Sequence, residues 1–298
     1  MHKIFITFVI LFSSLINSRS YIDYESPYHP VVGNYGMVVS QNYLSSDIGI
    51  EILNKGGNAI DAAVAVGFSL AVTLPRAGNL GGGGFMMVYL KEKDEIFYID
   101  YRSKSPLNSN LENIFNISSS DGKKYEVVPK NFDTNKFDLL DTGYKASAVP
   151  GTVAGLLDAH AYFGKLELSE VLAPVIAQAK NGIVVSYDLH KAIESTPRLY
   201  DDLESRRIYF KNDTVIEENS ILKLPDLANT LSLISESGKD GFYKGTTAKK
   251  IIQAMNINGG LMKLEDFGQY KAEIRSPIST EYRGNKVFTA GPPPGGGI

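Results

Sequence analysis

Apolar and small residues fill nearly every position between residues 59 and 72, which predicts a helix buried on all sides rather than an amphipathic one. Asn58 is suited to cap the N-terminus of this helix. Four consecutive glycines follow at 81–84, and their freedom to adopt dihedrals that other residues avoid predicts a tight turn. Two apolar runs, 85–90 and 96–101, are separated by a short charged stretch, which favours an antiparallel hairpin. We expect this part of the chain to form the middle of a compact core, with the turn leading into a buried strand.

Local signals mark further elements along the chain. Ser45, Ser46 and Asp47 are N-cap candidates for an earlier helix, and Asp61 suits the electropositive first turn of the helix after Asn58. Helical spacing recurs at 151–164, 171–179, 187–196, 224–237 and 246–256, with a short helix start at 263–267. Strands are predicted at 35–40, 278–282 and 286–289, a turn at 240–245, and a long surface loop across the polar stretch 102–144.

Composition narrows the possible functions. With 298 residues, of which 43% are hydrophobic, the chain has ample material for a core. Thirty basic and 33 acidic side chains give a net charge of −3, so no general attraction to phosphate backbones is expected, and nucleic acid is a poor candidate partner. The sequence has no cysteine, which removes disulfides, thiolate metal sites and thiol catalysis.

The first twenty residues have the pattern of an export signal. A short positive start ends at Lys3, an apolar run covers 4–16, and Ser18-Arg19-Ser20 provides small residues around a cleavage point. We therefore interpret residues 1–20 as a signal peptide and expect a periplasmic or extracellular protein. The alternative is a membrane anchor, for which the apolar run is short compared with the roughly 20 residues that a spanning helix needs.

Several familiar site patterns are missing from the sequence. The glycines at 81–84 are not followed by lysine and a hydroxyl residue, and a strand rather than a helix is predicted after them, so a phosphate-binding loop is disfavoured. The four histidines are not spaced as metal ligands, and there is no Gly-x-Ser-x-Gly elbow. The sequence thus predicts no cofactor and no metal. Two sequons, at Asn116 and Asn212, are expected on surface loops.

Arg102 is the best candidate for a binding residue. It follows an apolar strand and precedes a polar loop, a place from which a guanidinium can hold a carboxylate through two parallel hydrogen bonds. Lysine does not offer that fork. Without further information, a solvated or ion-paired surface arginine remains the alternative, because most arginines are of that kind.

Several short blocks of residues follow one another along almost the whole mature chain. They are Gly56-Gly57-Asn58-Ala59-Ile60-Asp61-Ala62-Ala63-Val64-Ala65, the glycines at 81–84 with Phe85, Asp100-Tyr101-Arg102 with Pro106, Val149-Pro150-Gly151-Thr152-Val153-Ala154-Gly155, Tyr162-Phe163-Gly164-Lys165-Leu166, Phe242-Tyr243-Lys244-Gly245, Gly259-Gly260 before Asp266, Tyr282-Arg283-Gly284 and Pro292-Pro293-Pro294. In this order they resemble the gamma-glutamyltranspeptidase family, also called glutathione hydrolases.

The resemblance implies a fold and an activity. Members are exported precursors that cut themselves into a large N-terminal and a small C-terminal subunit, and they resemble the N-terminal-nucleophile hydrolases. The fold expected is therefore α+β, a four-layer αββα sandwich of which residues 21–298 would form an incomplete large-subunit region. The new N-terminal threonine cleaves the gamma-glutamyl amide of glutathione and related compounds, and the acyl group passes to water or to an amino acid or peptide.

The resemblance also bears on individual residues. Arg102 matches the family arginine that holds the alpha-carboxylate of the gamma-glutamyl donor, and we expect it to bind substrate. The chain stops inside the part that resembles the large subunit, so we assign no catalytic residue and expect the small subunit as the missing partner. Two alternatives stay open: a non-catalytic binding fragment, and a related acylase that acts on beta-lactam side chains or poly-gamma-glutamate.

Overall fold

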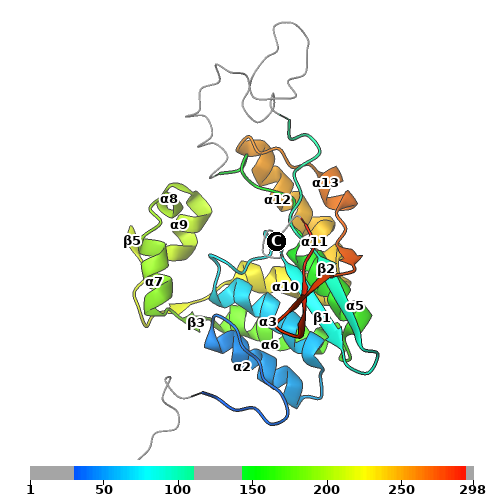
Figure 1. Ribbon diagram of the computed structural model, residues 1–298. Helices are drawn as coiled ribbons and strands as arrows, with labels where there is room; N and C mark the ends of the chain where they lie inside the picture. The colour runs from blue at the N-terminus through cyan, green and yellow to red at the C-terminus, as the bar shows by residue number, and fades with distance from the viewer. Residues whose placement is uncertain (1–29, 111–142, 293–298) are drawn as a thin grey trace, which may run out of the picture. The chain divides into compact units, whose positions relative to one another are not determined.

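The computed structural model of the protein describes residues 30–110 and 143–292 (Figure 1). It divides into two compact units, Met1–Met37 and Val38–Ile298, and the described helices and strands belong to the second. The predicted signal peptide at 1–20 and the sequon at Asn116 lie outside the described residues. Helices and antiparallel strands both occur in the described part, so the predicted α+β class is confirmed.

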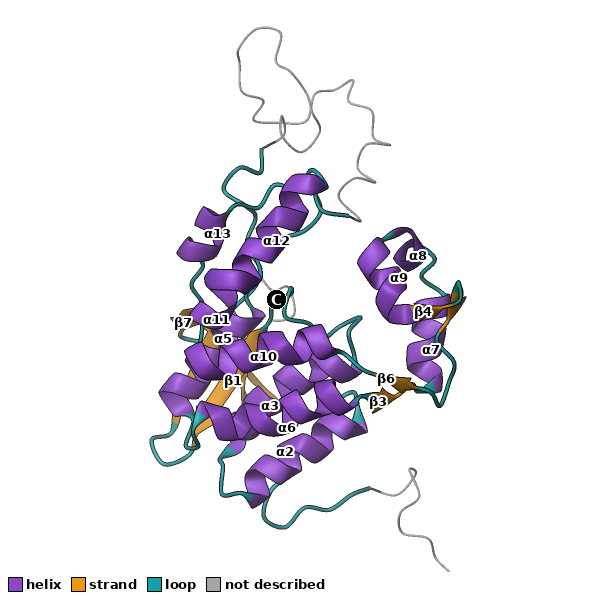
Figure 2. Ribbon diagram, turned by 180° about the vertical axis from the view of Figure 1, so that it is seen from behind, coloured by secondary structure: helices purple, strands orange, loops and turns teal. Residues whose placement is uncertain are grey.

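Four helices pack in sequence against one another and form the helical layer. They are α2 (Tyr43–Asn54), α3 (Ala59–Thr73), α6 (Leu168–Asn181) and α10 (Pro225–Ser237), which lie side by side in Figure 2. As predicted, α3 is buried on most sides, and several of its side chains are fully inaccessible to solvent: Val64, Ala65, Phe68 and Val72. The helix thus occupies the centre of the core.

The starts of α2 and α3 differ in how well the sequence predicted them. Asn58 caps α3, as expected: its side chain accepts the backbone N–H groups of Ile60 (2.8 Å) and Asp61 (3.0 Å). The prediction for α2 was wrong, because the cap is Asn42 rather than a residue at 45–47. Ser45 is instead buried inside the helix pair, where its hydroxyl lies 2.8 Å from the Ser69 hydroxyl.

The predicted hairpin forms part of a three-stranded antiparallel sheet. Strands β1 (Phe85–Leu90) and β2 (Glu95–Asp100) pair as expected, and β7 (Glu273–Arg275) adds to β2 in the order β1-β2-β7. The sequence did not predict β7, which has only three residues, all exposed. This strand brings a late part of the chain beside the end of β2, where Asp100 faces Glu273 in the register.

One face of this sheet packs on helices and the other is largely open. Val88 and Ile99 join the core, and the Phe97 ring packs at a tilt against Phe163 of α5 (Thr152–Phe163), with ring centroids 5.0 Å apart. The prediction of a buried β1 was therefore half wrong, since its alternate residues are exposed: Phe85, Met87 and Tyr89. Tyr98, on the same face as Met87, is buried, yet its hydroxyl has no hydrogen-bond partner among the described residues.

Most of the remaining predictions agree with the structure. The expected helices appear as α5, α7 (Tyr187–Glu194), α12 (Gly245–Ile257) and α13 (Leu264–Gln269), and the last hairpin as β8 (Ile278–Tyr282) and β9 (Asn285–Thr289). Two predictions were wrong: residues 35–40 are irregular, and the predicted turn contains helix α11 (Asp240–Tyr243). Short elements that the sequence did not predict are α8 (Arg198–Asp201), α9 (Leu203–Tyr209), β3 (Ile183–Val184) with β6 (Ile221–Leu222), and β4 (Phe210–Lys211) with β5 (Thr214–Val215). Within 30–110 and 143–292, no helix has the length and apolar character needed to cross a membrane.

Candidate functional site

The glycine run before β1 allows backbones to approach closely. None of the glycines at 81–84 has a positive φ, so the predicted reason for them, unusual dihedrals, was wrong. A Cβ at Gly83 would collide with the backbone of residues 101–103, and one at Gly84 with the Tyr101 ring. The Gly82 carbonyl accepts the N–H of Gly151 (2.7 Å) and so joins the turn to the start of α5. The run therefore positions the end of β2.

Tyr101, the residue directly before Arg102, is held by contacts of both its ring and its backbone. Its ring lies against Gly155 of α5, where a Cβ would overlap the ring atoms. Its N–H donates to the Gly84 carbonyl at 3.0 Å, and the Gly84 N–H returns a longer bond of 3.3 Å. Burial raises the pKa of the Tyr101 hydroxyl to about 12. The backbone is thus fixed up to the last residue before Arg102.

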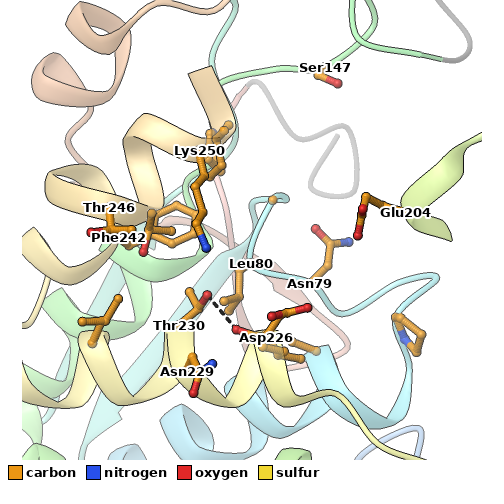
Figure 3. A pocket seen from close by; sticks show the side chains of 18 of the residues that line it. Asn79, Leu80, Ser147, Glu204, Asp226, Asn229, Thr230, Phe242, Thr246 and Lys250 are labelled. Atoms are coloured by element: carbon orange, nitrogen blue, oxygen red, sulfur yellow. Dashed lines mark hydrogen bonds between the residues drawn. The ribbon is translucent and has the colours of Figure 1, made fainter. Parts of the chain in front are cut away.

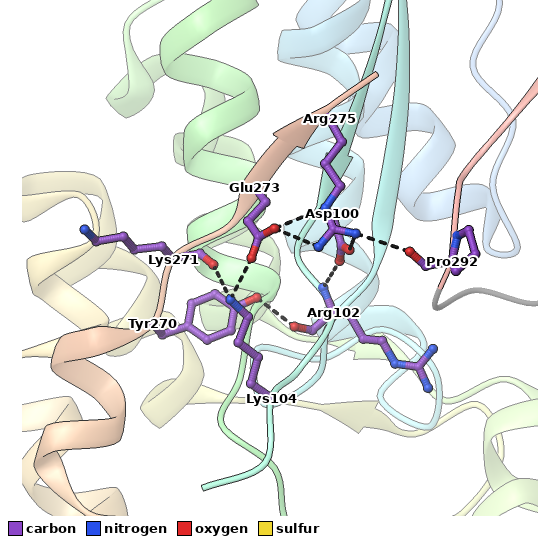
Figure 4. Close-up of polar contacts among 8 residues, drawn as sticks. All are labelled: Asp100, Arg102, Lys104, Tyr270, Lys271, Glu273, Arg275 and Pro292. Atoms are coloured by element: carbon purple, nitrogen blue, oxygen red, sulfur yellow. Dashed lines mark hydrogen bonds and ion pairs between the residues drawn. The ribbon is translucent and has the colours of Figure 1, made fainter. Parts of the chain in front are cut away.

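Arg102 directly follows the residue that pairs with Gly84, and its own backbone groups hydrogen-bond to side chains (Figure 4). Its N–H donates to Asp100 Oδ1 at 3.1 Å, and its carbonyl accepts the Tyr270 hydroxyl at 2.9 Å. The arginine is exposed, and Figure 4 shows its guanidinium directed away from Asp100. Among the described residues the guanidinium makes no hydrogen bond or ion pair. No residue of 30–110 or 143–292 therefore occupies its donors.

The carboxylates near Arg102 are occupied by other cations. Asp100, 9% exposed, lies 3.4 Å from Arg275 Nη1, and Glu273 Oε2 lies 2.7 Å from Arg275 Nη2. Lys104 Nζ lies 3.2 Å from the other oxygen of Glu273. Hydrogen bonds from Arg275 and then Lys104 hold the pKa of Glu273 below its usual value. Because these acids are already paired, the charge of Arg102 is not neutralised by a close partner in the described part of the chain.

The segment after Arg102 is also held in place, although the sequence suggested a surface loop. Lys104 and Val149 exchange two backbone hydrogen bonds of 3.1 and 2.8 Å. Further on, the buried Asp266 accepts the N–H of Leu107 at 2.7 Å and that of Lys263 at 2.6 Å. Arg102 therefore projects from a rigid part of the molecule, and the remainder of the predicted loop, 111–142, lies outside the described residues.

A hollow of about 1030 Å³ lies between α10 and α12 (Figure 3). Its walls are largely apolar, including Leu80, Phe242, Met255, Met262 and Phe267. Lys250 and Asp226 lie on different walls, and Figure 3 shows the Lys250 ammonium pointing inward. Arg102 is not among the residues that line this hollow. A charged small molecule would therefore meet Arg102 outside it.

The other polar candidates have structural roles. His160 Nε2 lies 2.9 Å from the Leu166 carbonyl, and His190 Nδ1 lies 2.8 Å from the Ile216 carbonyl. No group of three potential metal ligands occurs in residues 30–110 and 143–292. Asn212 lies exposed in the turn between β4 and β5.

Sequence reasoning missed two residues that hold Arg102. Asp100 was part of a recognised block, but nothing in the sequence pattern showed that its carboxylate accepts the backbone N–H of Arg102. Tyr270 lies 168 residues further along the chain, and no local signal singles it out. The carboxylate two positions before an arginine at a strand end was the one available hint.

Comparison with known proteins identifies the family. The family model described as gamma-glutamyltranspeptidase matches residues 45–298. The glutathione hydrolase proenzyme of Escherichia coli strain K12 is 38% identical over 276 residues, which are 92% of this chain and 45% of that protein. The crystal structure of Helicobacter pylori gamma-glutamyltranspeptidase superposes with a TM-score of 0.80 at 36% identity, over 90% of this chain and 73% of that one.

A related enzyme with another name also matches. The crystal structure of cephalosporin acylase from Bacillus halodurans has a TM-score of 0.71 at 26% identity, over 90% of this chain and 49% of that one. The chain spans about half the length of the curated relatives it matches. The family model covers most of the sequence, and the ordered blocks and the fold agree with it, so this chain belongs to the gamma-glutamyltranspeptidase family.

Proposed function

We propose that this chain is the N-terminal, large-subunit part of an exported gamma-glutamyltranspeptidase precursor, and that Arg102 binds the alpha-carboxylate of the gamma-glutamyl donor. The observation that carries the proposal is the placement of Arg102: its backbone is held on both sides while its guanidinium stays unpaired among the described residues. A guanidinium with free parallel donors matches the two oxygens of a carboxylate. The donor class is glutathione and related gamma-glutamyl amides.

The chemistry requires a second part of the protein. In the proposed reaction a threonine hydroxyl at the N-terminus of the small subunit attacks the gamma-glutamyl carbonyl, with its own amino group as base. The acyl group then passes to water or to an acceptor amine. The exposed side chains of β1, Phe85, Met87 and Tyr89, are suited to packing against that second part.

A pair of substrates tests the role of Arg102. A gamma-glutamyl anilide carries the alpha-carboxylate, whereas a 4-aminobutanoyl anilide has the same amine and chain but lacks it. In the processed precursor, Arg102→Ala should lower kcat/KM for the first substrate, mainly by raising KM. The loss of transition-state stabilisation should be about 2–4 kcal/mol. The second substrate should be unaffected. Arg76→Ala is the matched control, because Arg76 pairs with Asp188 at the surface. An unchanged KM in Arg102→Ala would show that Arg102 does not bind the donor carboxylate.

Export is tested separately, by the mass of the N-terminus of the protein recovered from its producing cells. Cleavage near Ser20 would leave a chain without the first twenty residues. A protein that keeps Met1 and stays with the membrane fraction would instead support the anchor.

A related acylase is the second candidate function, favoured by the likeness to cephalosporin acylase. Such an enzyme would hydrolyse a glutaryl or beta-lactam side-chain amide as fast as a gamma-glutamyl amide. A preference for the gamma-glutamyl anilide over the glutaryl anilide, which keeps the carboxylate and lacks only the amino group, excludes it; Arg102→Ala should weaken binding of both substrates. Processed protein without turnover of any of these amides would favour the non-catalytic fragment.

A further inference from the structure

The backbone of Arg102 is satisfied in an unusual way. Up to Tyr101 the chain pairs with the glycine turn through main-chain hydrogen bonds. One residue later, neither the N–H nor the carbonyl of Arg102 has a main-chain partner in residues 30–110 and 143–292, and both bond to side chains instead. Asp100 accepts from the N–H, and Tyr270, the C-cap residue directly after α13, donates to the carbonyl.

We propose that Tyr270 and Asp100 are positioning residues, which clamp the backbone of Arg102 from its two sides and so set the direction in which its guanidinium meets the donor carboxylate. The inference rests on the function proposed for Arg102. Bidentate recognition depends strongly on orientation, so a loosely held arginine would bind a carboxylate less well even with its charge unchanged.

Tyr270 is itself held firmly enough to act as one side of the clamp. Only 9% of the residue is exposed, and its ring stacks on Tyr243 with an interplanar angle of 2° and centroids 5.8 Å apart. The Tyr243 hydroxyl donates to the Pro150 carbonyl at 2.8 Å. Gly151 lies directly against the Tyr270 hydroxyl, and a Cβ there would occupy its position. Burial raises the pKa of Tyr270, so the hydroxyl keeps the proton that it donates.

Asp100 forms the other side of the clamp. While Oδ1 accepts the Arg102 N–H, its second oxygen lies 3.4 Å from Arg275 Nη1. Arg275 is in turn bonded to Glu273 of the same strand, at 2.7 Å. The carboxylate therefore cannot turn toward the Arg102 guanidinium without giving up an existing partner, so Asp100 does not compete with a ligand for this guanidinium.

A double-mutant cycle in the processed precursor tests the clamp. Tyr270→Phe keeps the stacked ring and removes the donor, so KM for the gamma-glutamyl anilide should rise about 3- to 10-fold, with kcat changed less. In the Arg102→Ala background the same substitution should have no further effect on KM. Asp100→Ala should behave in the same way, and Asp100→Asn, which keeps an acceptor oxygen, should restore part of the affinity. Tyr200→Phe, which loses a hydroxyl bond to Asp213 elsewhere, is the control.

The outcomes separate this inference from the proposed function. If Tyr270→Phe raises KM equally with and without Arg102, the tyrosine acts on the fold in general and the clamp is wrong. If Arg102→Ala raises KM but Tyr270→Phe and Asp100→Ala do not, the clamp alone is overturned. If Arg102→Ala itself leaves KM unchanged, Arg102 does not bind the donor carboxylate, and the positioning role of Tyr270 and Asp100 is refuted as well.

Discussion

The fully buried carboxylate of Asp61 accepts the backbone N–H of Lys165, 104 residues further along the chain, at 3.0 and 3.1 Å from its two oxygens. It also accepts the N–H groups of Asn58 (2.8 Å) and Leu166 (3.3 Å). The sequence suggested only that Asp61 suits the first turn of α3. The structure shows that it also joins the start of α3 to the turn that follows α5.

Replacing Asp61 should therefore cost much stability. Asp61→Ala removes the buried carboxylate that accepts three backbone N–H groups, those of Asn58, Lys165 and Leu166, and we expect the free energy of unfolding to fall by about 3 kcal/mol or more. Urea unfolding followed by circular dichroism measures the change. Asp188→Ala is the control, since that carboxylate is 64% exposed in a surface pair with Arg76 and its loss should change little. Similar midpoints for the two variants would contradict the structural role of Asp61.

Two glycines offer a matched test of the packing beneath Arg102. A Cβ at Gly155 would overlap the Tyr101 ring, whereas a Cβ at Gly268 in α13 meets no atom within 4 Å. Gly155→Ala should destabilise the protein by about 1–3 kcal/mol through overpacking. Gly268→Ala should be neutral or stabilising by up to about 1 kcal/mol, because alanine favours the helix. Thermal unfolding of both variants checks this, and a tolerated Gly155→Ala would show that the ring can move.

The elements that the sequence predicted well are those whose signal is local. The buried pattern of α3, its Asn58 cap and the β1–β2 hairpin need only neighbouring residues, and they are as expected. Strand β7 was missed because its three exposed residues have no apolar alternation, and only pairing with β2 makes them a strand. The turn predicted at 240–245 contains a helix because Phe242 and Tyr243 are buried in the core, which local propensity does not reveal.

The candidate site shows the same limit. Arg102 was found because its position after a strand and its resemblance to a family block are visible in the sequence. The partners of its backbone were not found, since Tyr270 comes from the end of a distant helix and Asp100 acts through a bend of the chain. The glycines at 81–84 were recognised, but their role as contact points for other backbone depends on what lies against them.

The partly buried Tyr101 predicts how stability depends on alkaline pH. Its pKa is raised to about 12 by burial, against about 10 in an unfolded chain. Between these values the folded state holds a proton that the unfolded state has lost, so stability is full below pH ~10 and falls as the pH rises to ~12. Tyr101→Phe should flatten this part of the curve.

Unfolding measurements between pH 9 and 12, with tyrosinate absorbance as a second signal, check the alkaline prediction. The expected loss attributable to Tyr101 is about 2 kcal/mol. Tyr162→Phe is the control, because Tyr162 is 66% exposed and its removal should leave the curve unchanged. Tyr243 and Tyr270 also have pKa values raised by burial, so Tyr101→Phe reduces the sensitivity without removing it. Equal curves for Tyr101→Phe and the unmodified protein would contradict the assignment.

Arg102→Lys separates the charge of the arginine from its shape. Lysine keeps the positive charge but has no planar fork, so it can hold one carboxylate oxygen well and the second poorly. For the gamma-glutamyl anilide, KM should rise about tenfold or more, less than in Arg102→Ala, with kcat nearly unchanged. The 4-aminobutanoyl anilide, which has no carboxylate to hold, should be turned over equally by the lysine variant and the unmodified enzyme. Arg76→Lys, the same exchange at an exposed ion pair, should leave both substrates unaffected. If Arg102→Lys matched the unmodified enzyme on the gamma-glutamyl substrate, a point charge would suffice there and the bidentate geometry inferred for Arg102 would be wrong.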